Sequence, residues 1–193
     1  MTTRPFLLGT AFLVACAHAQ RGGGDACRPV TGQLPASAST RDMRGNFVLT
    51  MTATGGAHAG RTARGTLSLE PQDSALVAVA GATQPLRGTA AIALEAVGAV
   101  RMGDLADSAA DSPGVGVYEQ RPAAGAPGAP TVIIRVGSAS NARGPQPFDA
   151  GYTALYVKRI TGRGFAGGWA SSAGPTYPPR RAEGYFCAVR AEP

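Results

Sequence analysis

The chain has 193 residues, of which 44% are hydrophobic and 16% charged, a balance that suits one folded domain and excludes an intrinsically disordered protein. Its 27 glycines and 15 prolines follow no fixed period, which excludes collagen and long helices and favours short strands joined by tight turns. The net charge of +6 comes mostly from arginines scattered singly along the chain, without a basic run interleaved with aromatic residues. We therefore expect no nucleic-acid partner.

The amino terminus has the pattern of an export signal. A short cationic start, Met1–Pro5, precedes about ten mostly apolar residues, Phe6–Ala15. A stretch of that length matches the hydrophobic region of a secretory signal peptide, whereas a membrane-spanning helix needs about 20 apolar residues. We expect residues 1–15 to be a signal peptide that is removed on export.

The end of this segment, Leu13-Val14-Ala15-Cys16, resembles the lipobox of bacterial lipoproteins. The resemblance implies that Cys16 is acylated and becomes the mature amino terminus. The lipid bilayer would then be a partner, and the protein would be anchored in the cell envelope, facing the periplasm or the exterior. The alternative is cleavage after Ala17-His18-Ala19, a small-x-small site, which would leave an unmodified protein that begins at Gln20.

The cysteine count agrees with lipidation. Three cysteines are an odd number for an exported protein, but acylation of Cys16 leaves Cys27 and Cys187 as a pair. An oxidising compartment permits a disulfide between them, which would tie the two ends of the domain together. Closing a loop of about 160 residues is worth roughly 4–5 kcal/mol in the chain-entropy model. Two free thiols are the alternative.

Residues 16–44 have the composition of a flexible tether, with three consecutive glycines at 22–24 and small polar residues over Pro35–Thr40. Order would begin at Cys27 if that residue is bridged. Residues 45–193 then form the folded domain.

The clearest hairpin of the chain follows the tether. Residues Asn46–Thr52 alternate apolar and polar side chains, and so do Thr62–Leu69 after a glycine-rich turn. Ala75–Ala82 fits either a strand or a short helix. We expect further strands at Leu86–Leu94, Val97–Met102, Val115–Gln120, Thr131–Val136, Tyr152–Lys158, Gly164–Ser171 and Glu183–Arg190.

About eight or nine short strands predict an all-β domain that forms a single small antiparallel barrel, with a β-sandwich as the alternative. We prefer the barrel because closure removes exposed strand edges and because a bridge from Cys27 to Cys187 would bring the two ends together. In size and strand count the domain is similar to lipocalin-like and avidin-like barrels. The Gly-x-Trp of the first lipocalin strand has no counterpart in the first strand here, and Gly167-Gly168-Trp169 lies near the carboxyl end instead.

Catalytic and metal-binding motifs are missing from the sequence, so we expect no cofactor and no metal. His18 and His58 are the only histidines, and neither HExxH nor paired CxxC spacing occurs. Asp104, Asp107 and Asp111 do not have the spacing of an EF-hand loop. The glycine-rich residues 162–168 lack the Lys-Ser/Thr of a phosphate loop and are more typical of a strand that bends at a barrel corner.

An aromatic group near the carboxyl end suggests two readings. In a barrel these side chains would line a cavity for a small apolar ligand or would belong to the core; they are Trp169, Phe165, Tyr152, Tyr156 and Tyr185. We expect a non-enzymatic envelope lipoprotein whose barrel binds such a ligand. The alternatives are a structural or interaction protein that uses a sheet face, and a hydrolase that uses carboxylates such as Glu95, Glu119 or Glu183. The sequence does not fix the oligomeric state.

Overall fold

The computed structural model describes residues 27–72, 77–78, 82–100, 114–123, 126–137, 152–173 and 180–192. Within them, nine strands form one antiparallel sheet. The strands are β1 (Gly45–Ala53), β2 (Thr62–Pro71), β3 (Val77–Ala78), β4 (Ala82–Ala91), β5 (Gly114–Gln120), β6 (Thr131–Val136), β7 (Tyr152–Thr161), β8 (Gly164–Ala173) and β9 (Arg180–Arg190). Three short 3₁₀ helices accompany them: η1 (Thr40–Met43), η2 (Gly56–His58) and η4 (Leu94–Val97).

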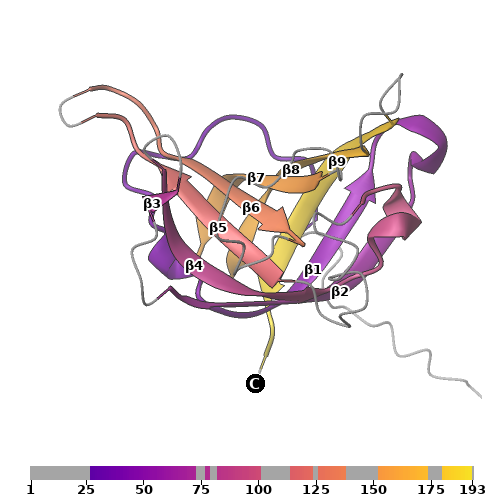
Figure 1. The fold of residues 1–193 in the computed structure, drawn as a ribbon, viewed down its shortest axis with the longest axis horizontal. Coiled ribbons are helices and arrows are strands. Elements are labelled where there is room, and N and C mark those ends of the chain that lie inside the picture. The colour runs from indigo at the N-terminus through magenta and orange to yellow at the C-terminus, as the bar shows by residue number, and fades with distance from the viewer. Residues whose placement is uncertain are drawn as a thin grey trace, which may run out of the picture.

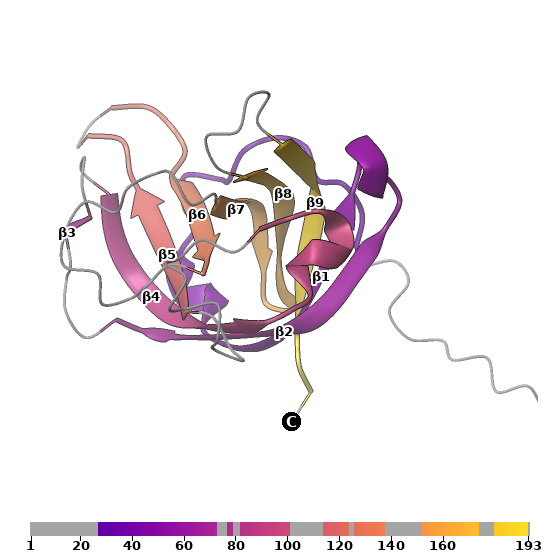
Figure 2. The ribbon, with the colours of Figure 1, turned by 45° about the vertical axis from the view of Figure 1, so that its right-hand side comes forward.

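The sheet closes on itself. Neighbours in the sheet are largely neighbours in the chain; β1 pairs with β9, and β2 pairs with β4. Apart from the two-residue β3, the strands therefore make an eight-stranded up-and-down barrel, which Figures 1 and 2 show as a ring of arrows. The predicted small antiparallel barrel is confirmed, and the sandwich alternative is excluded.

Alternation along each strand decides which side chains enter the barrel. In β1 the residues Phe47, Leu49, Met51 and Ala53 are buried, and the intervening positions are more exposed. Apolar burial of this kind stabilises a fold by roughly 1.5–3 kcal/mol for each large side chain. The buried residues from all around the ring form one core cluster.

Both ends of the barrel are closed by short 3₁₀ helices. We call the end where β1 begins the η1 end, and the opposite end, where β4 ends, the η4 end. Met43 of η1 packs into the core cluster from one side, and Leu94 and Val97 of η4 pack into it from the other. At the η4 end the hydroxyl of Thr153 donates to the Val100 carbonyl and lies 2.8 Å from Ser171 Oγ. Ser171 Oγ accepts from the Val100 amide (2.9 Å), and these contacts tie the segment after η4 to the barrel rim.

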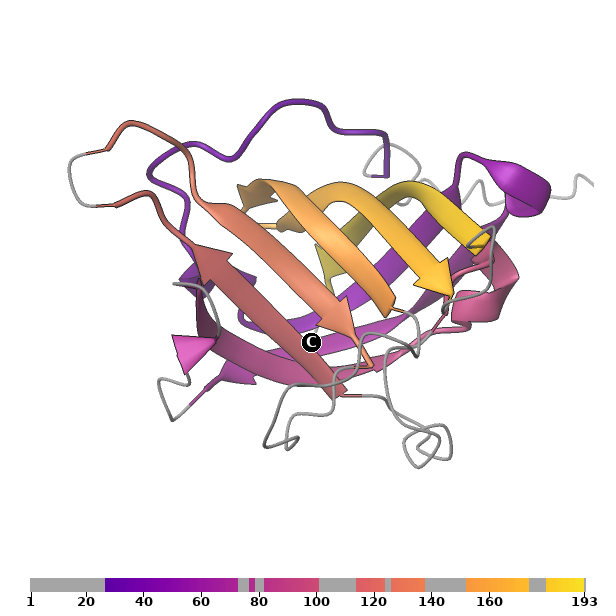
Figure 3. The ribbon, with the colours of Figure 1, turned by 45° about the horizontal axis from the view of Figure 1, so that its top comes forward.

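The segment before η1, residues 27–39, is a strap on the barrel rather than a free tether. Its first residue is joined to β9 through Cys187, and Leu34 is buried with the core. Figure 3 shows this segment in indigo, running along the outside of the strands before it turns into η1. Residues 27–44, which have the composition of a tether, thus pack on the barrel, as expected if Cys27 is bridged.

Most expected strands coincide with observed ones to within a few residues, but Val97–Met102 is wrong as a strand. Val97 ends η4, Gly98 follows with a left-handed φ of 74°, and residues 99–100 belong to no strand; residues 101–102 lie outside the described residues. The apolar residues of this segment are buried because they plug the barrel end, not because they lie in the sheet. The ambiguous range Ala75–Ala82 contains the short strand β3.

The backbone of β8 approaches that of β7 closely at Gly167. A Cβ at this position would lie 1.9 Å from the carbonyl oxygen of Tyr156 on β7. The two backbones can approach only because no side chain stands between them.

Candidate binding site

The aromatic residues expected to act together are divided between two environments. Phe165 and Trp169 point inward, where Phe165 makes an edge-on contact with Phe47 at a centroid distance of 5.0 Å. The indole Nε1 of Trp169 donates to the carbonyl oxygen of Thr52 (3.1 Å). Both side chains are thus parts of a packed interior.

Tyr156 and Tyr185 do not join them. Tyr156 is 38% exposed on the outer face of β7. Tyr185 precedes the buried Phe186 and so takes an outward position on β9, and Tyr152 begins β7 opposite Ser172. The five residues therefore do not line one cavity.

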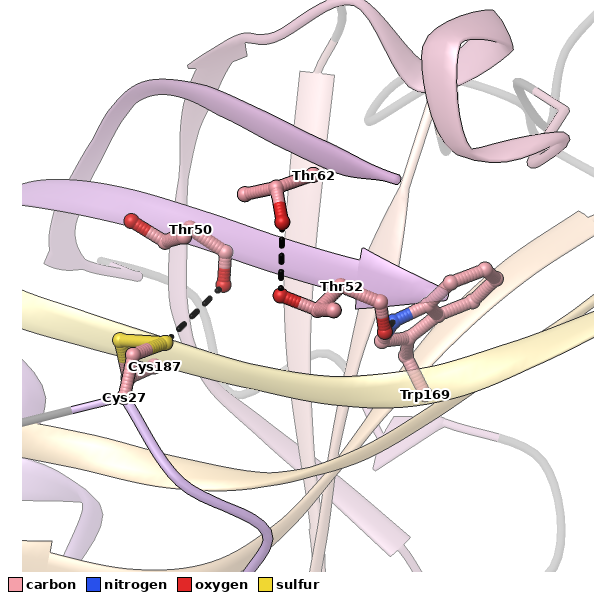
Figure 4. The surroundings of a disulfide bond; sticks show 6 residues. All are labelled: Cys27, Thr50, Thr52, Thr62, Trp169 and Cys187. Carbon is pink, nitrogen blue, oxygen red and sulfur yellow. Dashed lines mark hydrogen bonds between the residues drawn. A yellow bond between two sulfur atoms is a disulfide. The ribbon is translucent and has the colours of Figure 1, made fainter. Parts of the chain in front are cut away.

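The cysteines behave as the pairing predicts. The sulfur atoms of Cys27 and Cys187 are 2.14 Å apart, and their Cα atoms are 5.2 Å apart. Figure 4 shows the bond above β9, with Cys27 Sγ 3.8 Å from the carbonyl oxygen of Thr50 on β1. Cys16, His18 and the aspartates at 104, 107 and 111 lie outside the described residues.

The three carboxylates considered for catalysis are not brought together. Glu95 and Glu183 are exposed at the η4 end, whereas Glu119 lies at the η1 end and is only 8% exposed. They do not form a facing pair of the kind that glycoside hydrolysis uses.

Glu119 instead belongs to a pocket at the η1 end. The pocket has a volume of about 370 Å³, which falls in the range of small-molecule sites. Its walls are η1 with the end of the strap, the start of β4, and the end of β5. It is lined by Ser39, Thr40, Arg41, Arg44, Thr83, Pro85, Leu86, Glu119 and Arg121.

Protein groups already occupy both oxygens of the Glu119 carboxylate. The hydroxyl of Thr40 donates to Oε2 (2.8 Å), and Arg121 Nε lies 2.5 Å from Oε1 in an ion pair. Arg121 Nη2 also donates to the carbonyl oxygen of Ala38 (3.0 Å). The Glu119–Arg121 pair thereby links the end of the strap, η1 and the end of β5.

Two further arginines reach the pocket from η1. In a 3₁₀ helix the side chains at i and i+3 are eclipsed. Thr40 and Met43 lie three residues apart on the buried side of η1. Arg41, in η1, and Arg44, which follows it, are offset by one residue and lie on another side. Neither Arg41 nor Arg44 forms a salt bridge within the part of the chain that the structure describes. With three arginines and one glutamate, the lining has a net charge of +2.

Arg190 binds the backbone at the end of η1. Its Nη1 donates to the carbonyl oxygen of Arg44 (2.9 Å), and its Nη2 donates to that of Asp42 (3.2 Å). The guanidinium also lies 5.0 Å from the ring centroid of Phe47, at the start of β1. Gly45, with a φ of 114°, leaves room for this side chain, because a Cβ there would lie 2.7 Å from Arg190 Nη1.

A second pocket, of about 280 Å³, lies across β1, β2 and β4 and has no charged lining residue; the lining residues are Asn46, Phe47, Val48, Thr66, Leu67, Ser68, Thr89, Ala91 and Ala191. The pocket at the η1 end is therefore the better candidate for specific chemistry. Among the described residues there is no group of three or more His, Cys, Asp or Glu side chains that could hold a metal ion. Nor does any described helix have the length and apolarity to cross a membrane.

Comparison of the chain with protein-family models, with curated proteins and with solved structures finds no match in any of the three.

Proposed function

We propose that this is an exported, lipid-anchored protein of the cell envelope whose barrel binds a small anionic ligand in the pocket at the η1 end. The observation that carries the ligand proposal is the pocket itself, where Arg41, Arg44 and Arg121 surround a space of about 370 Å³ with only one carboxylate among its lining residues. A positive, partly enclosed surface of this kind favours anions.

The site supports binding rather than catalysis. A general acid or base must be free to reach the substrate. Glu119 is engaged by Thr40 and Arg121 through both of its oxygens. The barrel interior offers less support for an apolar ligand, because the inward residues Phe165 and Trp169 are packed in the core.

The proposed export and lipid anchor rest on the sequence. The lipobox-like Leu13–Cys16 follows a short hydrophobic stretch, and acylation of Cys16 leaves two cysteines. That remaining pair is bonded in the barrel, which is consistent with folding in an oxidising compartment.

Mass spectrometry of the intact protein from the membrane fraction tests the anchor. We expect a chain that begins at Cys16 and carries acyl groups. An unmodified chain that begins at Gln20 would exclude the lipoprotein.

Isothermal titration calorimetry tests the binding site with a panel of small organic anions and their uncharged counterparts. We expect anions to bind and the double variant Arg41→Gln/Arg44→Gln to lose most of that binding. Arg64→Gln is the matched control, because Arg64 is exposed on the outer side of β2, away from the pocket. Binding of uncharged apolar compounds alone, or anion binding unchanged in the double variant, would contradict the proposal.

A further inference from the structure

We infer that the ligand of this pocket carries a phosphate group in its dianionic, monoester form. This inference rests on the proposed function, since it names the class of anion that the same site would take. Three properties of the pocket support it: the arrangement of its walls, the unused hydrogen-bond donors and the net charge.

The donors come from two segments that line the pocket. Arg41 lies in η1 and Arg44 is the residue that follows η1, whereas Arg121 follows β5. A carboxylate has two oxygens in one plane, and a single guanidinium can satisfy both of them. A tetrahedral phosphate has three acceptor oxygens that point in different directions, so it can accept from donors of both segments at once.

Most of the donors are not used by the protein. A guanidinium has five N–H groups; Arg121 donates one of them to the Ala38 carbonyl, and its Nε forms an ion pair with Glu119. The Arg41 and Arg44 side chains donate to no described residue. The Ser39 hydroxyl accepts from the Arg41 amide (3.2 Å), which leaves its own hydrogen for a ligand.

The charge of the pocket matches a dianion better than a monoanion. The lining carries +2, and a phosphate monoester carries about −1.5 to −2 at neutral pH. A single carboxylate would leave a positive charge in the pocket without a partner.

Glu119 provides a prediction of opposite sign to that for the arginines. Glu119→Gln removes one negative charge next to the ligand but keeps an oxygen that can accept from Thr40. We expect phosphate affinity to rise roughly threefold or more at low salt, with the gain reduced as salt is added. A Glu119 that itself bound a cationic ligand group would give weaker binding in this variant.

A phosphate monoester has two sources near a membrane, a soluble metabolite and a lipid headgroup. Both present the same phosphate monoester group, so the experiment needs separate probes for the soluble metabolite and for the lipid headgroup. Inorganic phosphate and glycerol 3-phosphate serve as soluble probes. Phosphatidylcholine vesicles with phosphatidic acid, or with phosphatidylglycerol in its place, serve as membrane probes, because only phosphatidic acid presents a monoester.

The test uses the mature protein and titrates both phosphates, succinate and glycerol by calorimetry, with vesicle co-sedimentation as the membrane arm. Wild type, Arg64→Gln, Glu119→Gln and the double variant Arg41→Gln/Arg44→Gln are compared after their thermal transitions have shown that each is folded. We expect a phosphate probe to bind wild type and Arg64→Gln equally, the double variant at least tenfold more weakly, and Glu119→Gln more tightly.

The outcomes separate the two proposals. Binding of glycerol 3-phosphate in solution supports the inference with a soluble ligand, and binding to phosphatidic acid vesicles alone supports it with a lipid headgroup. Succinate binding that depends on Arg41 and Arg44, without phosphate binding, overturns the inference but leaves the anion site intact. The phosphate inference is wrong if no probe binds, or if the only binding is to vesicles and does not distinguish the two anionic lipids. The proposed function is wrong too if, in addition, no anion shows binding that depends on Arg41 and Arg44.

Discussion

Gly184 is the point at which the Trp169 indole crosses from β8 over β9 to reach β1. The indole Nε1 donates to Thr52 O at 3.1 Å, and a Cβ at position 184 would lie 2.7 Å from that nitrogen and 1.8 Å from that oxygen. We expect Gly184→Ala to lower the free energy of unfolding by about 2 kcal/mol or more, because backbone and indole must both shift. Urea denaturation followed by tryptophan fluorescence measures it.

Gly162→Ala is the control for that variant. Gly162 lies in the turn between β7 and β8, and a Cβ there meets nothing within 4 Å. We expect its stability to stay near that of wild type. Equal losses in the two variants would mean that the cost comes from the loss of a glycine as such and not from the crowded crossing.

A second prediction for a single residue concerns the contribution of Arg190 to stability. Lysine keeps the charge but loses the planar fork that reaches the carbonyl oxygens of Asp42 and Arg44 and lies over Phe47. We expect Arg190→Lys to lower the free energy of unfolding by about 1–2 kcal/mol. Arg181→Lys, at an exposed position of the same strand, should have almost no effect in the same denaturation experiment.

The residues of the site differ in how far the sequence could reveal them. Val115, Val117 and Glu119 share one parity on β5, so alternation alone assigns Glu119 to the inward face. That signal was available, and a carboxylate in such a position predicts a polar partner. Arg41 and Arg44 gave no such signal, because they follow a stretch whose composition resembles a tether. Their proximity to Glu119 depends on where η1 packs, which is a property of the whole barrel.

At the scale of elements, the strap depends on the disulfide between Cys27 and Cys187. The bond closes a loop with a sequence separation of 160 residues. We expect Cys27→Ser/Cys187→Ser to lower the free energy of unfolding by about 2–5 kcal/mol, because the unfolded chain gains freedom. Chemical denaturation with and without a reductant measures this loss.

The reductant supplies the control for this prediction. Reduction should destabilise wild type by a similar amount and leave the double variant unchanged. A reductant effect that persists in the double variant would show that another thiol reaction, and not this bond, is responsible.

The elements also show where alternation predicts structure well. The hairpin of β1 and β2 was evident because one face of each strand is buried and the other is solvated. Leu94 and Val97 of η4 are equally apolar, but their burial comes from the end of the barrel. The apolar pattern of a segment indicates that its residues are buried, but it does not show whether they lie in a strand or in a segment that closes the barrel end. For the same reason the burial of Leu34 and Met43 could not be inferred from the segment that contains them.

At the scale of the whole molecule, closure depends on a close approach of β2 and β4. A Cβ at Gly88 would lie 1.7 Å from the carbonyl oxygen of Ser68, and one at Gly65 would lie 2.0 Å from that of Ala91. These glycines lie on facing sides of the pairing that completes the ring. The local sequence shows two glycines in strands, but only the closed topology explains why both are needed there.

A closed ring with one core predicts cooperative unfolding of the entire barrel. The core cluster includes residues of the eight barrel strands together with Met43, Leu94 and Val97 from the two ends, so no part of the ring has an apolar interior of its own. We expect urea unfolding to give the same midpoint by fluorescence of Trp169, the single tryptophan, and by far-UV circular dichroism, which reports on all strands. Reduction of the disulfide should move both midpoints together. A fluorescence transition that precedes the dichroism transition would show that the region around β8 unfolds separately, and the barrel would then have two folding units in place of one.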